Sequence, residues 1–165
     1  MSSGSRKRNR RGAARLAAVQ ILYEMELAGA SSDAVLRDFL AGRWNLESAS
    51  QAVEPDSAFL ADLVRGVTDR RADIDPMVGA ALSADWTLER LEVILQAILR
   101  AGAYELLAET DIPPRVVITE YVDVAHAFFS GNEPGLVNGV LDRLAHTLRP
   151  DELEAADGGQ GEDER

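Results

Sequence analysis

The sequence contains no cysteine, only two histidines and a single lysine among its 17 basic residues. Without cysteine the chain has neither disulfide bonds nor a thiolate nucleophile, and it does not need an oxidising compartment. No apolar run approaches the roughly 18 to 20 residues of a membrane helix, and glutamates interrupt the apolar segment that follows the basic start, unlike in a signal peptide. We therefore expect a soluble, cytoplasmic protein that has no membrane partner.

The parts of a catalytic or metal site are also scarce. His126 and His146 fall on the polar faces of predicted helices, and neither has a second histidine or a cysteine at a metal-ligand spacing. The chain lacks the glycine motifs that bind nucleotide phosphates and the serine motif of the hydrolases. We expect no catalytic residue, no metal ion, no cofactor and no enzyme activity.

Positive charge is concentrated at the start of a chain whose formal net charge is -11. No acidic residue precedes Glu24, and residues 151–165 carry seven acidic side chains against one basic. Blocks of like charge are usually solvated and often act as interaction tails. We predict a disordered basic arm over residues 1–9, a folded domain over residues 10–149 and a disordered acidic tail over residues 150–165. The six charges of the basic segment are Arg6, Lys7, Arg8, Arg10, Arg11 and Arg15.

Between these ends the apolar residues recur with the 3.6-residue period of helices, and no period-2 alternation indicates a strand. The segment from Arg10 to Ala28 is apolar around most of its circumference, which is typical of a helix in the middle of a bundle. A short helix is predicted over Asp33 to Leu40, and a polar loop with Trp44 follows. The next helix starts at Ser57, and Pro76 is expected to bend or restart it.

The second half of the chain predicts three more helices. One has its apolar face from Leu91 to Leu106, and its Gly102 permits a neighbouring helix to come close. Pro113 and Pro114 suit the first turn of the next helix, and Pro134 starts the last one. The predicted fold is all-α, a compact bundle of six to seven helices arranged as two small sub-bundles.

The basic segment favours nucleic acid over an anionic membrane or a protein-docking role, because arginine binds phosphate through two parallel hydrogen bonds. Later helices are too poor in basic residues for a DNA recognition helix, so single-stranded RNA fits better. Tyr23 and Phe128 are candidates for stacking on unpaired bases. Asn138 and Gly139 interrupt the last helix, either because Gly139 permits a close helix crossing or because Asn138 presents its amide to a ligand.

Four segments, in this order and spacing, resemble the bacterial transcription antitermination factors of the NusB family. They are RRGAARLAAVQILYEMEL, AILRAGAYELL, IPPRVVITEYVDVA and LVNGVLDRL, and the likeness covers most of residues 10–149. The resemblance implies an all-helical, non-catalytic protein. It also implies binding to the boxA element of nascent ribosomal RNA transcripts, jointly with NusE, a small-subunit ribosomal protein, in the transcription elongation complex.

By position, the resemblance assigns RNA contacts to the arginine-rich segment, to Tyr23 and to Asn138. Leu136 stands where the family usually has an aromatic residue, and Leu95 stands where it often has a polar one. Two alternatives stay open. The first alternative to RNA binding is a helical protein-protein scaffold, such as a homodimer, without direct RNA binding. The second is a stand-alone relative of the N-terminal domain of rRNA cytosine methyltransferases.

Overall fold

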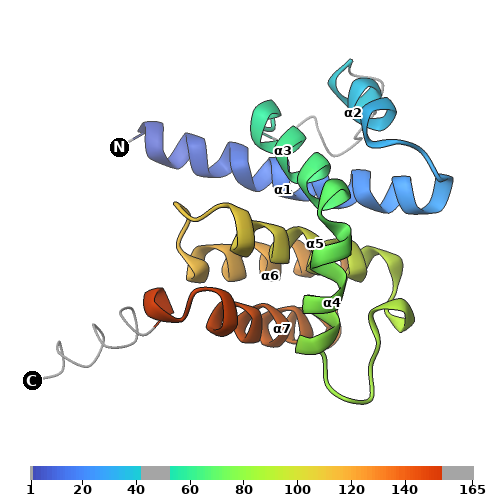
Figure 1. Cartoon of the computed structure of the whole chain (residues 1–165). Helices are drawn as coiled ribbons and strands as arrows, with labels where there is room; N and C mark the ends of the chain where they lie inside the picture. The colour runs from blue at the N-terminus through green and yellow to red at the C-terminus, as the bar shows by residue number, and fades with distance from the viewer. Residues whose placement is uncertain (1, 42–52, 154–165) are drawn as a thin grey trace, which may run out of the picture.

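The computed structural model describes residues 2–41 and 53–153, with side chains from Asn9 onward. Every regular element in these residues is helical, which confirms the all-α prediction (Figure 1). None of the described helices is long and apolar enough to cross a membrane. The elements are α1 (Ser2–Ala28), α2 (Ser32–Leu40), α3 (Ser57–Asp69), α4 (Arg71–Ala81), the 3-10 turn η2 (Leu88–Arg90), α5 (Val93–Ala108), α6 (Pro114–Phe128) and α7 (Glu133–Leu148).

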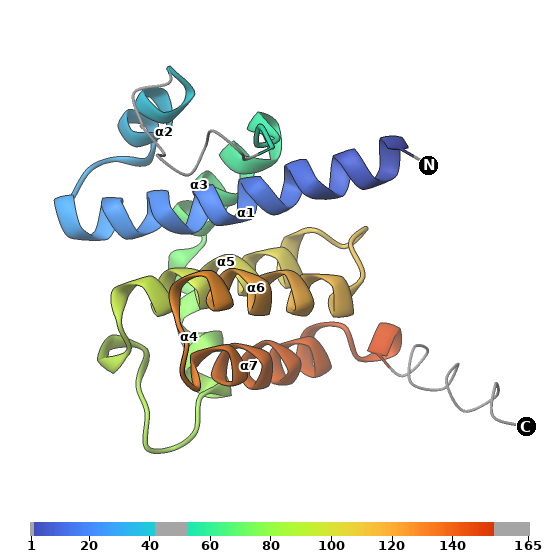
Figure 2. The same cartoon turned by 180° about the vertical axis from the view of Figure 1, so that it is seen from behind.

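The helices form the two predicted sub-bundles, and α5 runs between them. Helices α1, α2 and α3 pack together on one side, and α4, α6 and α7 lie on the other (Figures 1 and 2). Helix α5 contacts both groups, and its residues from Leu95 to Leu106 are all buried. It is therefore the shared core of the molecule, and the long α1 crosses above it.

Local sequence signals explain where the helices begin. The Asp56 carboxylate accepts a hydrogen bond from the Phe59 backbone N–H (3.1 Å) and caps α3, and Ser31 caps α2 in the same way. Helices α6 and α7 each begin with proline in the first turn, where its missing N–H has no consequence. The predicted apolar face of α3 is buried as expected.

Two glycines allow helices to approach closely. A Cβ at Gly102 of α5 would lie 2.8 Å from Cδ1 of Leu141 on α7, which confirms the predicted close approach. A Cβ at Gly66 of α3 would overlap the ring of Tyr104. At Gly139 the nearest atom is 3.7 Å away and belongs to Arg143 of the same helix. The suggested close crossing at Gly139 is therefore wrong.

Both ends of the chain differ from the sequence prediction. Residues 2–9 continue α1, because adding residues to a helix that already exists avoids the nucleation cost and no proline prevents it. Residues 150–153 form a helical turn in which Leu153 is 1% exposed. Arg149 hydrogen-bonds to Glu152 and to the Thr110 carbonyl oxygen and holds this turn against the body. Residues 154–165 lie outside the described part of the chain.

The helix that starts at Ser57 ends earlier than predicted. It breaks at Arg70 rather than at Pro76, which lies inside α4. Pro76 is exposed, so water can satisfy the backbone carbonyl that loses its partner there. The break lets α3 pack on α1 while α4 packs on α7. The loop position predicted for Trp44 lies outside the described residues.

Candidate nucleic-acid interface

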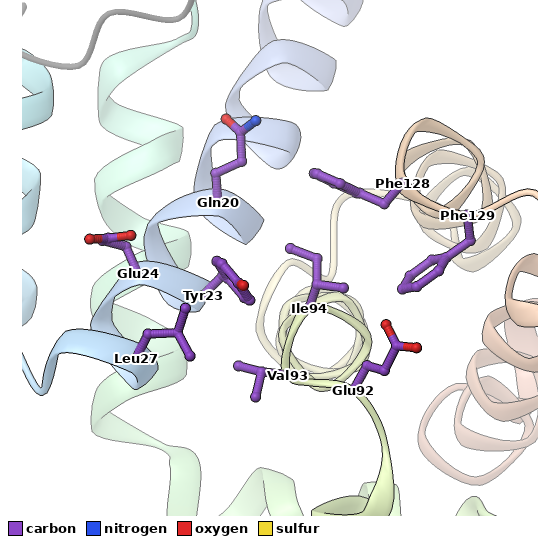
Figure 3. A pocket seen from close by; sticks show the side chains of 9 residues that line it. All are labelled: Gln20, Tyr23, Glu24, Leu27, Glu92, Val93, Ile94, Phe128 and Phe129. Carbon is purple, nitrogen blue, oxygen red and sulfur yellow. The ribbon is translucent and has the colours of Figure 1, made fainter.

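A groove of about 650 Å³ opens between α1, the start of α5 and the end of α6. Figure 3 shows Tyr23 and Ile94 facing the two phenylalanines across it. Tyr23 and Phe128, both proposed from the sequence as base-stacking residues, are each 36% exposed and line the same groove. The structure therefore brings these two together, in a place where flat apolar rings are open to solvent. The lining residues are Gln20, Tyr23, Glu24, Leu27, Glu92, Val93, Ile94, Phe128 and Phe129.

The groove and the basic segment belong to the same helix. Tyr23 stands 13 residues beyond Arg10 in α1, which corresponds to about 20 Å along the helix axis at 1.5 Å per residue. Because α1 is continuous, the basic segment and the groove keep a fixed spacing. At 100° per residue, however, Arg10 and Tyr23 point about 140° apart around α1. A strand that contacts both therefore has to cross over the helix.

Arg15 does not belong to the exposed basic surface, and its prediction as an RNA contact is corrected. It is 2% exposed, and its guanidinium donates two hydrogen bonds to Glu105 on α5, at 2.8 and 2.9 Å. A carboxylate oxygen of Glu120 lies 3.6 Å from it. Burial is the largest single effect and opposes the charge, but the hydrogen bonds to Glu105 and the attraction of Glu105 and its neighbours together leave the pKa of Arg15 raised. A phosphate has no access to this side chain.

The preceding arginines are nearer to the surface. Arg10 is exposed, and its Nε donates a hydrogen bond to the Glu54 carbonyl oxygen at 3.4 Å. Arg11 is half-buried, with its guanidinium carbon 4.9 Å from the centre of the Phe59 ring. Arg10 thus remains available for phosphate, and Arg11 in part. Arg6, Lys7 and Arg8 lie in the first turns of α1, and their side chains are outside the description.

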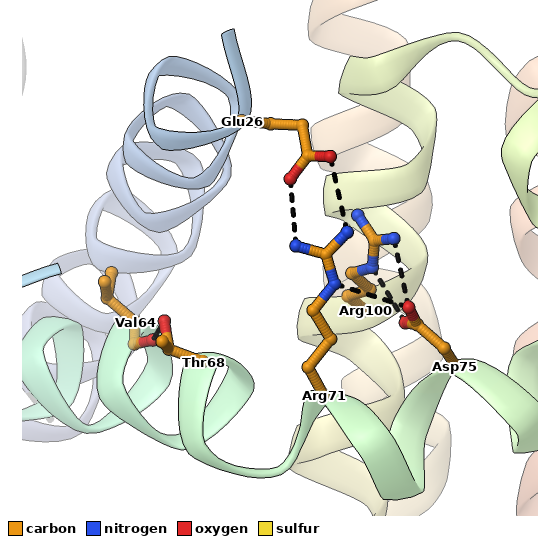
Figure 4. Close-up of polar contacts among 6 residues, drawn as sticks. All are labelled: Glu26, Val64, Thr68, Arg71, Asp75 and Arg100. Atoms are coloured by element: carbon orange, nitrogen blue, oxygen red, sulfur yellow. Dashed lines mark hydrogen bonds and ion pairs between the residues drawn. The ribbon is translucent and has the colours of Figure 1, made fainter. Parts of the chain in front are cut away.

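A network of ion pairs holds the C-terminal half of α1 in place. Arg71 of α4 donates hydrogen bonds to Glu26 of α1, at 2.9 and 3.3 Å, and also reaches Asp75 (Figure 4). Arg100 of α5 donates to the same aspartate at 2.8 Å. The hydrogen bond from Arg71 lowers the pKa of Glu26. The network ties α1, α4 and α5 together three residues from Tyr23, so it fixes one wall of the groove.

Sequence reasoning missed a second groove of about 400 Å³ beside the first. Its main aromatic is Trp86, 52% exposed, in the segment between α4 and η2. Leu95 and Leu136, the two positions at which the chain departs from the family resemblance, line this same groove. Glu92 lines both grooves. The sequence feature that could have indicated this groove is Trp86, a single tryptophan in a segment between two helices.

Asn138 is exposed on α7, but it lines neither of these grooves. It lies two positions after Leu136, which places the two side chains about 200° apart around the helix. The structure therefore does not bring Asn138 together with Tyr23 and Phe128. A role for Asn138 in RNA binding remains a prediction for a separate surface.

No group of three histidine, aspartate or glutamate residues in the described part of the chain is placed to hold a metal ion. The fold and the site define an all-helical protein with an aromatic surface groove and a basic extension on the same helix. The model of the NusB family matches residues 12–146. The chain belongs to the NusB family.

Named relatives and solved structures agree with this assignment. The transcription antitermination protein NusB of Bradyrhizobium sp. strain ORS 278 is 50% identical over 150 residues, covering 90% of this chain and 89% of the relative. That of Maricaulis maris is 50% identical over 152 residues, covering 92% and 94%. The structure of T. maritima NusB has a TM-score of 0.72 at 28% identity and covers 87% of this chain and 96% of that chain.

Proposed function

We propose that this chain is an RNA-binding transcription antitermination factor of the cytoplasm. It binds the boxA element of nascent ribosomal RNA transcripts together with NusE, and it supports transcription of ribosomal RNA by the elongation complex and ribosome assembly. It acts by binding rather than by catalysis. Family membership and the names of its relatives support this proposal.

The observation that carries the proposal is the arrangement along α1. Positive side chains occupy its N-terminal part, and Tyr23 opens into an aromatic groove further along the same helix. The groove is lined by two glutamates and by no basic residue, so phosphates are repelled there while base faces can stack. The basic segment attracts the backbone, and the groove receives unstacked bases.

The salt dependence of RNA binding tests the basic segment. Three or four phosphate contacts predict that log K falls with log salt at a slope of roughly -2 to -3, since each contact on a single strand contributes about -0.7. Replacing Arg6, Lys7, Arg8 and Arg10 with glutamine should weaken binding to all RNAs and bring this slope close to zero. Fluorescence anisotropy with a labelled boxA RNA measures both quantities.

Arg65→Gln is the matched control, because Arg65 is an exposed arginine of α3 that pairs only loosely with Asp33, at 3.5 Å. Its affinity and slope should equal those of the unmodified chain. If the folded four-residue variant binds RNA undiminished, the role of the basic segment is refuted. Repeating the titration with NusE tests the joint complex, and a dimer that binds no RNA would support the protein-scaffold alternative instead.

A further inference from the structure

Glu92 places an uncommitted carboxylate at the edge of the aromatic groove. It occupies the N-cap position of α5, yet its side chain does not cap the helix. In the described part of the chain it makes no side-chain hydrogen bond or ion pair. In Figure 3 its carboxylate points toward the ring of Phe129, whereas that of Glu24 points away from the groove. Glu92 is exposed and therefore ready to accept hydrogen bonds from a ligand.

The chemistry of the groove selects the kind of ligand. Its rings offer stacking surfaces, and none of its lining residues is basic, so it suits a base and not a phosphate. A carboxylate accepts hydrogen bonds through two oxygens and donates none when ionised. Guanine matches this, because its Watson–Crick edge presents two adjacent donors, N1–H and the N2 amino group. Uracil presents one donor between two carbonyl oxygens, which repel a carboxylate.

We propose that Glu92 recognises an unpaired guanine that stacks in the groove against Tyr23 and Phe128. This inference rests on the proposed RNA-binding function and adds a base preference to it. The guanine lies at least about six stacked nucleotides from the phosphates held near Arg10, because Tyr23 is about 20 Å further along α1 and each stacked nucleotide spans about 3.4 Å. The two side chains also point about 140° apart around α1, which lengthens the path of the strand. The strand thus places its backbone on the basic segment and this base in the groove.

The test uses uridine RNAs of about 12 nucleotides, long enough to span the basic segment and the groove. One guanosine is moved through each position in turn, and affinity is measured by fluorescence anisotropy. At its best position, guanosine should improve affinity about tenfold over the all-uridine RNA, in line with a bidentate base contact. Inosine, which lacks the N2 amino group, should keep only part of that gain.

Glu92→Gln should reduce the guanosine-to-uridine affinity ratio to about threefold or less. Removing a negative charge also raises affinity for every RNA, so the ratio, and not the affinity, is the readout. Glu89→Gln is the matched control, because Glu89 is exposed in η2, loses the same charge and lines neither groove. Its ratio should stay at about tenfold.

The outcomes separate this inference from the proposed function. If the unmodified chain binds RNA but shows no guanosine preference, or if Glu92→Gln keeps the tenfold ratio, the role of Glu92 is overturned and RNA binding stands. If neither the uridine RNAs nor boxA RNA bind, both are overturned. A ratio that falls in Glu92→Gln and stays in Glu89→Gln supports the inference.

Discussion

Replacing Arg15 with methionine should lower the free energy of unfolding by about 3–5 kcal/mol, because the change leaves a fully buried carboxylate without its counter-charge. Glu105 is 0% exposed, and both of its oxygens accept hydrogen bonds from Arg15. The nearby carboxylate of Glu120 adds a second negative charge at the same place. The hydroxyl of Tyr121 is no substitute for the guanidinium, since burial and then Glu105 raise its pKa, which keeps it neutral.

Removing both partners should be much less harmful than removing one. In the double variant Arg15→Met with Glu105→Leu, neither charge of the buried pair remains, so the free energy of unfolding should equal or slightly exceed that of the unmodified chain. The cycle is completed by Glu105→Leu alone, with urea unfolding followed by circular dichroism as the assay. Arg65→Met is the exposed control and should change stability by less than about 1 kcal/mol.

The same variants test where Arg15 acts. If the double variant is as destabilised as the sum of the single variants, the buried pair is not the reason for the loss. If Arg15→Met lowers the free energy of unfolding by less than about 1 kcal/mol, the carboxylate of Glu105 is not left without compensation when Arg15 is removed. Because Arg15 is 2% exposed, the folded double variant should also bind RNA with an unchanged salt slope. A slope reduced by one phosphate contact, about 0.7, would return Arg15 to the RNA-binding surface.

Three further changes have defined outcomes. A hydrogen bond with Asp62 and partial burial raise the pKa of Glu109 to about 7. The folded state therefore holds this proton more tightly than the unfolded chain does. The free energy of unfolding should fall by about 1 kcal/mol, after allowance for solvent screening, as pH rises from about 4.5 to 7. Glu109→Gln should flatten that part of the profile in urea unfolding. Gly66→Ala should lower stability by about 1–3 kcal/mol, because the new methyl group overlaps Tyr104. Truncation before Leu153 should lower the melting temperature, since a buried leucine contributes about 1.5–3 kcal/mol.

Each of these three changes has a matched control. Asp69→Asn, which removes one acidic charge at an exposed position at the end of α3, is the control for Glu109→Gln. Gly79→Ala, where nothing lies within 4 Å of the new Cβ, should stabilise by about 0.5–1 kcal/mol. A chain that ends after Leu153 should melt like the full chain. If Gly66→Ala and Gly79→Ala change stability equally, the overlap with Tyr104 is not the cause of the loss. If Glu109→Gln leaves the pH profile of stability unaltered, the pH dependence does not come from Glu109. If both truncated chains melt at the same temperature, Leu153 does not stabilise the fold.

The sequence by itself determined the helical class, most helix positions and the apolar faces. The face from Phe59 to Val67 and the helix starts at the prolines depend on neighbours within a few residues, so periodicity and capping rules reach them. It also determined the charge distribution. A glycine on the apolar face of a helix indicated the close approach at Gly102, whereas the same inference for Gly139 was wrong.

Only the tertiary structure decided which of the candidate residues share a site. In the sequence, Arg15 looks like the other arginines of the basic segment. Its burial depends on pairing with Glu105, which is 90 residues away in the chain. The groove exists because α1, α5 and α6 meet there, and Glu92 belongs to it through its place at the start of α5. The break at Arg70 depends likewise on α3 and α4 packing against different helices. Such contacts are set by distances in space, and a one-dimensional pattern carries no record of them.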